Sequence, residues 1–550
     1  MMPFSQSECL LKNWKKWGPP LLAMSWLWLG TVLVAGDDCI AHSEILGQSS
    51  RQVRQQRTFC DDAPPNQAQT GRHFEIQIVD AETGRGVPLV ELKTVNGISY
   101  ISDSAGRIAF FEPGLMGKEV FFFVTSPGYE FPADGFGMRG KVLHPQPEAA
   151  VTLTLTRQNI AQRMYRVTGE GIYRDSVLLK HPVPLQNPVL NAGVLGSDSV
   201  LCTRFQKKLY WFWGDTQIAR YPLGRFHATG ATSPLPGDDG ALLPSQGVDL
   251  TYFVDQEGIA DNMAKMPGDG PTWLSGLTVL RDQAGTERMF AGYAKIKPPL
   301  EAYERGIVEF NTQTSRFEHR VTLPATAPLF PDGHPFPAQE NGVDYIYFAR
   351  PFPDVRVRAT VQDFLDVSRY ESFNCLRPGA APTKSRIVRN AQGIPQYEWR
   401  RQAPARDWRV EAELLESGML KPEEIPQQLK NADNGETVIA HSGSISWNPF
   451  RKRYVMIAIE WMGSSTLGEI WYAEAEDLRG PWGPARKIVT HKNVSFYNPL
   501  QHPELAEEGG RWIYFEGTYT HSFTDNKELT PRYEYNQIMY RLDLADPRLQ

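Results

Sequence analysis

Cysteine is scarce in this chain, with five residues in 550. No CxxC or CxxCH motif occurs, so cysteine gives no support to a metal, redox or haem site. Cys9 belongs to an N-terminal leader, whereas Cys202 and Cys375 lie in apolar stretches and are predicted to be small buried side chains. Cys39 and Cys60 share one polar segment and could pair as a disulfide, but their spacing alone does not show it.

Other signatures of function are also absent. The chain has no GxSxG, HExxH or P-loop motif, which leaves serine-hydrolase, zinc-protease and P-loop nucleotide chemistry without support. It has no basic block and a net charge of −6, so nothing favours a nucleic-acid partner. Long helical periodicities are few and aromatic residues make up 11% of the sequence, which favours a mostly β structure.

The first 35 residues have the pattern of a signal peptide. Lysines precede an apolar run over 21–35 that ends in LVAG, and a membrane span needs roughly 20 apolar residues. We therefore expect a secreted, periplasmic or cell-surface protein with no stable membrane span after cleavage. A retained anchor is the alternative. Residues 36–70 are rich in Gln, Ser and Arg, which predicts a disordered linker.

Residues 71–158 read as a small β-sandwich. Alternating strands such as FEIQIVD and VTLTLT are separated by Asp, Ser and Gly turns. Together with VDAETGRGVPLVEL, SDSAGRIAF and SPGY, they resemble the carboxypeptidase-regulatory-like (prealbumin-like) domains. That resemblance implies a fold and no chemistry. We expect a spacer or accessory unit, and we predict that both 36–70 and this sandwich are dispensable for the function of the remaining chain.

Residues 163–550 contain five similar units. Each has a strand, a tight turn and a second aromatic or aliphatic strand, for example SVLCTRF-QKK-LYWFWGD. Repeats of roughly 40–60 residues with four strands each are typical of a propeller. The predicted fold is therefore all-β, a small β-sandwich followed by a five-bladed β-propeller, with a two-sheet sandwich as the alternative. Residues 377–436, which look partly helical, form an insertion between the third and fourth blades.

The fifth unit has too few residues for a fourth strand. A circular propeller must cover its sheet edges. We predict that 164–174 supplies the outer strand of the fifth blade, next to Met539–Leu542.

Candidate site residues follow from the geometry of a blade. The start of each first strand and the end of each second strand share one face. Carboxylates there would supply acid and base, and aromatic side chains would stack on sugar rings. The candidate catalytic residues are Asp198, Asp215, Glu460 and Glu516. The candidate substrate-binding residues are Trp213, His227, Trp273, His334, Arg350, His441, Trp461, Tyr497 and Asn498. Each could instead serve structure alone: the aspartates as turn caps, the histidines and tryptophans as packing.

No metal site or cofactor is predicted for this face. The alternative is a structural cation in the channel, held by a histidine among His334, His441 and His502.

The segments NAGVLGSDSV, LYWFWGDT, HATGATS and WYAEAEDLRGPWGPA resemble the five-bladed propeller glycoside hydrolases. The resemblance implies that Asp198 is the general base and that a glutamate on a middle blade is the acid. The third blade departs from this pattern, because it offers His334 on that face and Glu340 on the opposite one. Glu460 or Glu516 would have to replace the acid. The predicted function is a secreted glycoside hydrolase-like protein acting on or binding a polysaccharide or oligosaccharide; the alternative is a non-catalytic propeller that binds carbohydrate or protein at the cell surface.

Overall fold

The computed structural model describes residues 71–219, 221–225, 227–298, 301–324, 327–378, 387–406 and 408–550. Within these ranges the protein is all-β, with only short helices, as the sequence predicted. The predicted leader and linker, and with them Cys39 and Cys60, lie outside the described residues. None of the helices in the described part is both long and apolar enough to cross a membrane.

The N-terminal unit, residues 71–158, consists of two four-stranded sheets that share one apolar core. β1 alternates between buried and half-buried residues, because its Phe and Ile side chains all point to the same side of the strand. One sheet has the order β4-β1-β8-β6 and the other β3-β2-β5-β7. The strands are β1 Phe74–Asp80, β2 Glu91–Thr94, β3 Ser99–Ile101, β4 Arg107–Phe110, β5 Val120–Thr125, β6 Tyr129–Glu130, β7 Gly140–Leu143 and β8 Ala150–Arg157.

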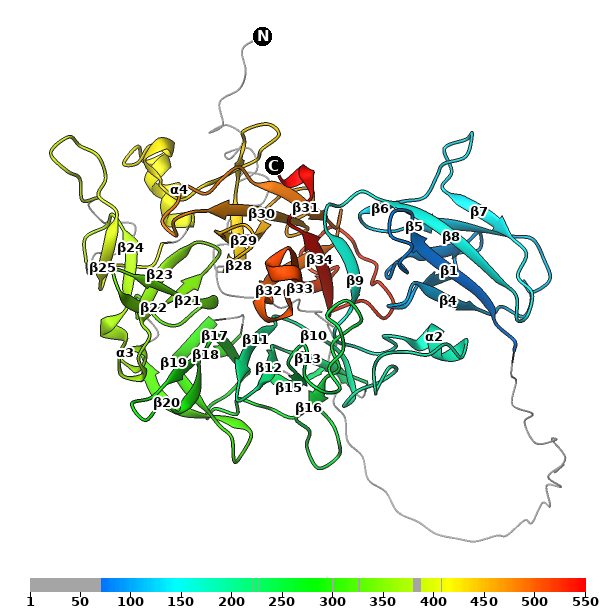
Figure 1. The fold of residues 1–550 in the computed structure, drawn as a ribbon, viewed down its shortest axis with the longest axis horizontal. Coiled ribbons are helices and arrows are strands. Elements are labelled where there is room, and N and C mark those ends of the chain that lie inside the picture. Colours follow the sequence, from blue (N-terminus) through cyan, green and yellow to red (C-terminus); the bar gives the residue numbers. More distant parts are fainter. Residues whose placement is uncertain are drawn as a thin grey trace, which may run out of the picture.

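Five further sheets follow one another in chain order around a common centre (Figure 1). The first has β11 Leu201–Phe205, β12 Lys208–Trp213, β15 Thr229–Pro234 and β16 Thr251–Tyr252. The second has β17 Thr272–Arg281, β18 Glu287–Lys297, β19 Glu301–Asn311 and β20 Arg316–Leu323. The third has β21 His334–Glu340, β22 Val343–Ala349, β23 Pro353–Arg358, β24 Glu371–Asn374 and β25 Glu398–Arg401. The fourth has β28 Ala440–Asn448, β29 Arg453–Glu460, β30 Glu469–Ala475 and β31 Arg486–Thr490. The fifth has β32 Ser495–Gln501, β33 Trp512–Thr520, β34 Asn536–Asp543 and β9 Gln162–Arg166.

Apolar side chains fill the space between each pair of neighbouring sheets. Separate clusters join the first sheet to the second, the second to the third, the third to the fourth and the fourth to the fifth. A further cluster, which includes Trp211 and Met539, joins the fifth sheet back to the first. The hydrophobic effect therefore acts around the whole ring of sheets, and we call residues 162–550 the ring unit.

The fifth sheet is completed from the opposite end of the ring unit, as predicted. β9 pairs antiparallel with β34, with Tyr165 opposite Met539 and Arg166 opposite Ile538. The paired strand begins at Gln162, two residues before the predicted segment, and ends at Arg166. All five residues of β9 are buried. The pairing satisfies the backbone of β34, which would otherwise form an open sheet edge.

The remaining elements are short. A three-stranded sheet contains β10 Val194–Ser197, β13 Thr216–Ile218 and β14 Tyr221–Arg225. β26 Leu429–Lys430 pairs with β27 Thr437–Val438. Among the described residues the α-helices are α2 Arg174–Leu178, α3 Val361–Leu365 and α4 Trp408–Glu416, and the 3₁₀ turns cover Val367–Arg369, Pro422–Glu424, Pro503–Leu505, Glu508–Gly510 and Pro547–Leu549. The predicted insertion, 377–436, is partly helical through α4, but it also adds β25 to the third sheet as a fifth strand.

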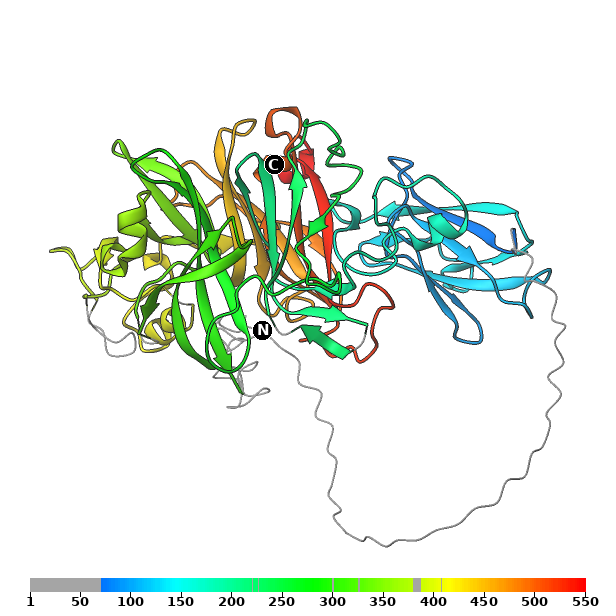
Figure 2. The ribbon, with the colours of Figure 1, turned by 90° about the horizontal axis from the view of Figure 1, so that it is seen from below.

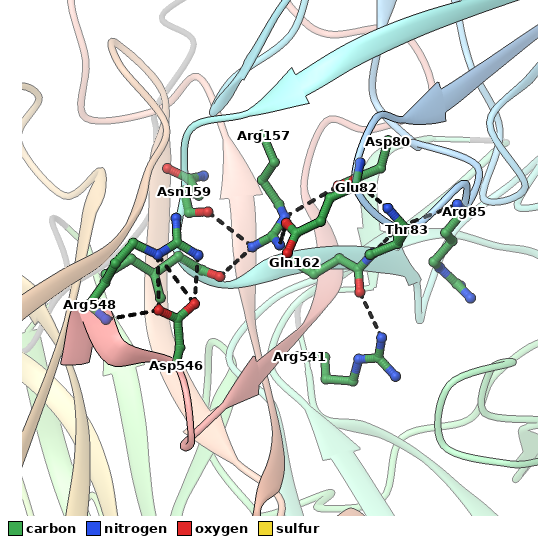
Figure 3. A network of polar contacts seen from close by, with 11 residues as sticks. Asp80, Glu82, Thr83, Arg85, Arg157, Asn159, Gln162, Arg541, Asp546 and Arg548 are labelled. Atoms are coloured by element: carbon green, nitrogen blue, oxygen red, sulfur yellow. Dashed lines mark hydrogen bonds and ion pairs between the residues drawn. The ribbon is translucent and has the colours of Figure 1, made fainter. Parts of the chain in front are cut away.

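The N-terminal unit lies beside the fifth sheet in both views (Figures 1 and 2). Charged and polar side chains fill the junction (Figure 3). Gln162 donates to Thr83 Oγ1 at 3.0 Å and accepts from Arg541 at 2.8 Å, while Arg85 donates to the Met164 carbonyl at 3.1 Å.

Arg163 extends this junction into the interior. Its side chain is 1% exposed and donates to the carbonyls of Pro88, Leu89 and Pro127. A guanidinium surrounded by fixed carbonyl groups holds the two units in one relative position, because each bond lost there leaves a buried polar group unsatisfied. That the N-terminal unit is dispensable for the function of the ring unit stays a prediction. The buried contacts of Arg163 argue against it, because removing the N-terminal unit would leave this side chain without its carbonyl partners.

Candidate functional site

The site lies where the first sheet of the ring unit begins. Asp198 follows β10 and Asp215 follows β12, and the two backbones are hydrogen-bonded. The Asp198 N–H donates to the Asp215 carbonyl at 3.3 Å, and the Gly214 N–H donates to the Asp198 carbonyl at 2.8 Å. A β-carbon at Gly214 would lie 2.2 Å from Asp198 Oδ1, so only glycine leaves room for that carboxylate.

The Asp198 carboxylate is enclosed by hydroxyl groups. It is 5% exposed, and Tyr497 donates to its Oδ2 atom at 2.9 Å. Burial raises the pKa of Asp198 to about 6, while the hydroxyls of Tyr497, Tyr535 and Ser199 act to lower it. Burial disfavours the charged form and hydrogen-bond donors favour it, so the carboxylate stays ionised near neutral pH.

Asp215 is more deeply buried, at 1% exposure. Trp273 Nε1 donates to its Oδ1 atom at 3.4 Å, and its Oδ2 atom has no hydrogen-bond partner among the described residues. Burial, followed by the charge of Asp198, raises the pKa of Asp215 well above its usual range. We infer that Asp215 holds the proton of this pair, because two neighbouring buried carboxyls cannot both ionise cheaply.

Asn498 links the pair to the neighbouring sheets. Its side chain donates to Ser199 Oγ at 2.8 Å and accepts from the Ser442 hydroxyl at 3.3 Å. Asn498 has a left-handed backbone, with φ of 51°, and it lies at an irregularity in the pairing of β32 with β33. Asparagine tolerates this conformation better than most residues.

The predicted geometry of the face holds for the first and second strands. His334 lies opposite Ala349, Ala440 lies opposite Glu460, and Thr272 lies opposite Lys295. Within each of these three sheets, the start of the first strand and the end of the second strand therefore lie at the same end. His227 lies beyond that same end of the first sheet, because the register pairs Thr229 with Trp213.

Glu460 belongs to a separate group on the fourth sheet. It is the last residue of β29, and its Oε2 atom accepts from Trp471 Nε1 at 2.8 Å. Burial raises the pKa of Glu460. Next to it, the ring of His441 stacks on that of Trp461, with centroids 5.2 Å apart. A carboxyl whose pKa is raised keeps its proton to a higher pH than a free glutamate.

A third group of charged side chains consists of Arg350 with Asp332 and Asp354. The two aspartates were not among the residues predicted from the sequence. The Arg350 guanidinium lies 3.0 Å from Asp332 and 3.9 Å from Asp354, and it donates to the Arg406 carbonyl at 3.3 Å. Burial raises the pKa of Asp354 to about 6, although Arg350 and Arg406 act to lower it. Arg350 thus ties the third sheet to the insertion that carries Arg406.

His334 is half-buried at the start of β21. Burial, with a contribution from the charge of His502, lowers the pKa of His334 to about 4. The ring is therefore neutral at physiological pH. Groups of three or more His, Cys, Asp or Glu side chains placed to hold a metal ion are not found in the described part of the chain.

Glu516 lies deeper than predicted, and this corrects one placement. It was expected at the end of its strand, but β33 continues to Thr520: Gly517–Tyr519 stay paired with β34, and Thr520 pairs with Ser495 of β32. Glu516 is 0% exposed, and its Oε1 atom lies 2.8 Å from His502 Nε2. It faces the interior between the fifth and first sheets.

Trp213 and Tyr497 are also buried, each at 1% exposure, so neither presents a face on which a sugar ring could stack. Trp213 packs on Tyr252 with ring centroids 5.4 Å apart. Tyr497 serves the site through its hydroxyl on Asp198. Trp273 and Trp461 are half-buried and remain the candidate platforms.

Tyr535 is a site residue that sequence reasoning missed. It is 7% exposed, and its hydroxyl lies near enough to the Asp198 carboxylate to favour the charged form of that group, although the hydroxyl has no hydrogen-bond partner among the described residues. It sits in an irregular turn before β34, where no periodic pattern indicates which way a side chain points. The sequence carries no local signal that would have found it.

Comparisons with known proteins yield structural neighbours only. No protein family and no curated protein matches this chain. Solved structures with a similar arrangement include glycoside hydrolases. An exo-β-1,3-galactanase from Phanerochaete chrysosporium is 9% identical over 70% of this chain and 65% of its own, with a TM-score of 0.34. An exo-1,5-α-L-arabinanase from a bovine ruminal metagenomic library is 10% identical over 64% and 94%, with a TM-score of 0.31. A Dyadobacter fermentans protein of unknown function is 8% identical over 70% and 98%, with a TM-score of 0.33.

These likenesses are too weak to transfer a reaction to this chain. The site must be interpreted from its own residues. Its central feature is a buried pair of carboxyl groups just beyond the ends of β10 and β12, contacted by Trp273 of the second sheet and Tyr497 of the fifth.

Proposed function

We propose that the ring unit is a five-bladed β-propeller and that the N-terminal unit is a small β-sandwich. Five antiparallel sheets that follow one another around a centre support the first assignment, together with the apolar cluster that joins the last sheet to the first. Two four-stranded sheets around one core support the second.

We propose that the chain acts on or binds a polysaccharide or oligosaccharide at the face that carries Asp198. The observation that carries the proposal is the buried pair of Asp198 and Asp215, whose surroundings raise both pKa values by different amounts. General acid–base cleavage of a glycosidic bond requires an ionised carboxylate as the base and a protonated carboxyl as the acid. The pair supplies the base, because the proton held by Asp215 leaves Asp198 charged.

In this proposal Asp198 is the base. It is ionised near neutral pH and would take a proton from the attacking water. Glu460 is the better candidate for the acid, because its pKa is raised and it ends a strand on the same face, whereas Glu516 is 0% exposed. Asp215 would hold its own proton and keep Asp198 charged.

A non-catalytic binding propeller is the second candidate, and one observation favours it. Asp198 and Asp215 are 5% and 1% exposed, so the protein itself fills most of the space around both carboxyls. A carboxylate that works on water needs access to it. The pair could instead fix the mouth of a carbohydrate- or protein-binding surface.

The experiment uses the full chain with a panel of soluble polysaccharides, assayed for released reducing ends and for binding by affinity electrophoresis. Asp198→Asn and Glu460→Gln should each abolish most release while leaving binding intact. Asp282→Asn is the matched control and should change neither release nor binding. Asp282 lies in the turn between β17 and β18, at the end of this hairpin away from Trp273. Binding without release in the wild type would select the second candidate. A wild type that neither binds nor cleaves any of the panel would reject the carbohydrate proposal.

We also propose that the chain is exported. The support is the leader pattern in residues 1–35. Cell fractionation with N-terminal sequencing tests this: a mature chain starting near residue 36 outside the cytoplasm agrees with it, and an intact N-terminus in the cytoplasm contradicts it.

A further inference from the structure

Asp198 is connected to the N-terminal unit by a short chain of contacts. The turn that precedes β34 carries Tyr533 and Tyr535 two residues apart. Tyr533 enters the N-terminal unit and Tyr535 enters the site. The two side chains therefore tie one turn to both units.

The N-terminal unit holds Tyr533 with two backbone groups. The Tyr533 hydroxyl donates to the Ser102 carbonyl at 2.8 Å and accepts from the Leu89 N–H at 3.1 Å. Tyr533 is 1% exposed, so both bonds lie away from water. Arg166 covers its ring at 4.5 Å and donates to the Arg532 carbonyl.

The same turn is fixed on its other side against the site. A β-carbon at Gly196 would lie 2.3 Å from the Tyr535 carbonyl oxygen, so the turn packs directly on β10, which leads into Asp198. Tyr535 itself has a left-handed backbone, with φ of 59°, which is uncommon for a bulky residue and persists only where the surroundings impose it.

We propose that the N-terminal unit positions Tyr535 against the Asp198 carboxylate, with Tyr533 as the positioning residue that transmits the constraint. The inference deepens the proposed function and rests on it, in that Asp198 is taken as the working carboxylate. The N-terminal unit then completes the site from outside the ring unit and is more than a spacer.

The ionisation of Asp198 provides a direct measure of this positioning. The titratable groups that face Asp198 are Asp215 from the same sheet, Tyr497 from β32 and Tyr535 from the turn. A phenol O–H facing a carboxylate favours its charged form. Loss or displacement of the Tyr535 hydroxyl should therefore move the titration midpoint of Asp198 upward.

The experiment is an infrared titration of the protonated-carboxyl band of the full-length protein, with Asp198→Asn used to identify the Asp198 component. Tyr535→Phe should raise the midpoint. Tyr533→Phe, which removes an oxygen that does not touch Asp198, should also raise the midpoint. The double variant should show no further rise beyond that of Tyr535→Phe, because both changes act on one contact.

Tyr370→Phe is the matched control. Tyr370 is buried in the ring unit and donates to a carbonyl, that of Phe364, away from the site. It should leave the midpoint unchanged. Should Tyr533→Phe fail to fold, Ser102→Ala disturbs the same loop, because the Ser102 hydroxyl bonds Val87 and Val90. It is expected to raise the midpoint as well.

A wild-type midpoint in a folded Tyr533→Phe variant would overturn the inference, as would shifts of the two single variants that simply add. The titration needs no substrate. A protein that cleaves and binds no sugar but shows the predicted shifts would reject the proposed function while leaving the positioning by Tyr533 standing.

Discussion

The Tyr497 hydroxyl donates to Asp198 Oδ2 across the junction of the fifth and first sheets, at 2.9 Å. Further bonds cross the same junction: the Ser199 N–H donates to Thr518 Oγ1 at 3.0 Å, and Gln537 donates to the Ser197 carbonyl at 3.0 Å. The carboxyl pair therefore lies where the last sheet of the ring unit meets the first. Tyr497 therefore joins the fifth sheet to the first and also favours the charged form of the Asp198 carboxylate.

Tyr497→Phe tests this double role. The variant loses the hydroxyl on Asp198 and leaves a buried carboxylate short of a donor, which should cost about 1–3 kcal/mol of unfolding free energy. It should also raise the titration midpoint of Asp198. Chemical denaturation and the infrared titration measure the two effects. An unchanged midpoint in a destabilised variant would mean that Tyr497 serves closure alone.

The pH dependence of stability gives a second test, at Asp215. Its pKa is raised in the folded protein, so the folded state keeps a proton that the unfolded chain loses near 3.8. The folded state then binds more protons than the unfolded state, and this group's contribution to the free energy of unfolding falls as the pH rises from about 4 towards the folded pKa. Asparagine does not titrate, so Asp215→Asn removes this decrease in the free energy of unfolding. The variant should gain thermal stability relative to the wild type as the pH increases from 4 to 8.

Asp477→Asn is the control of opposite sign. Hydrogen bonds from Arg479 lower the pKa of Asp477. Its contribution is present at neutral pH and lost as the pH falls through the folded pKa, so this variant should lose a little stability at pH 7 and none at low pH. A melting-temperature difference for Asp215→Asn that does not change with pH would contradict the assignment of the proton to Asp215.

The ends of the strands were the predictable part of the site. Asp215, Arg350 and Glu460 each follow or end a run of apolar residues, and the run itself shows where the strand leaves the core. Glu516 misled the same argument. The strand was assumed to stop at Glu516, but the β-branched and aromatic residues that follow, Thr518–Thr520, continue the pairing with β32.

The contacts between units could not be predicted in the same way. Arg163 binds the carbonyls of Pro88, Leu89 and Pro127, and Tyr533 binds backbone groups of Leu89 and Ser102. Every residue has a backbone carbonyl, so a residue of any type can accept such a hydrogen bond. The residue type at the accepting position therefore does not reveal the contact. Of the two buried arginines of β9, Arg166 lies in the predicted outer strand 164–174, and Arg163 lies outside it.

Glu516 and His502 give a third prediction. Both are buried, at 0% and 2% exposure, so removing one partner should destabilise the protein by about 3–5 kcal/mol, whereas replacing both by apolar residues should recover much of the loss. Glu516→Leu and the double variant Glu516→Leu/His502→Leu measure this by chemical denaturation. Glu476→Gln, which breaks an exposed pair with Arg453, is the control and should cost less than about 1 kcal/mol. A stable Glu516→Leu variant that has lost only sugar cleavage would restore the catalytic hypothesis for this residue.

Arg163→Met tests whether the two units unfold together. Methionine keeps much of the apolar stem but removes the donors to three carbonyls and to Ser126 Oγ, at 2.5 Å. The unpaired carbonyls should lower the melting temperature of the N-terminal unit more than that of the ring unit, so calorimetry should show one transition in the wild type and two in the variant. Arg281→Met, at an exposed arginine, should leave a single transition. Two transitions already present in the wild type would show that the junction does not couple the units, and the positioning of Tyr535 through Tyr533 would then lack its mechanical basis.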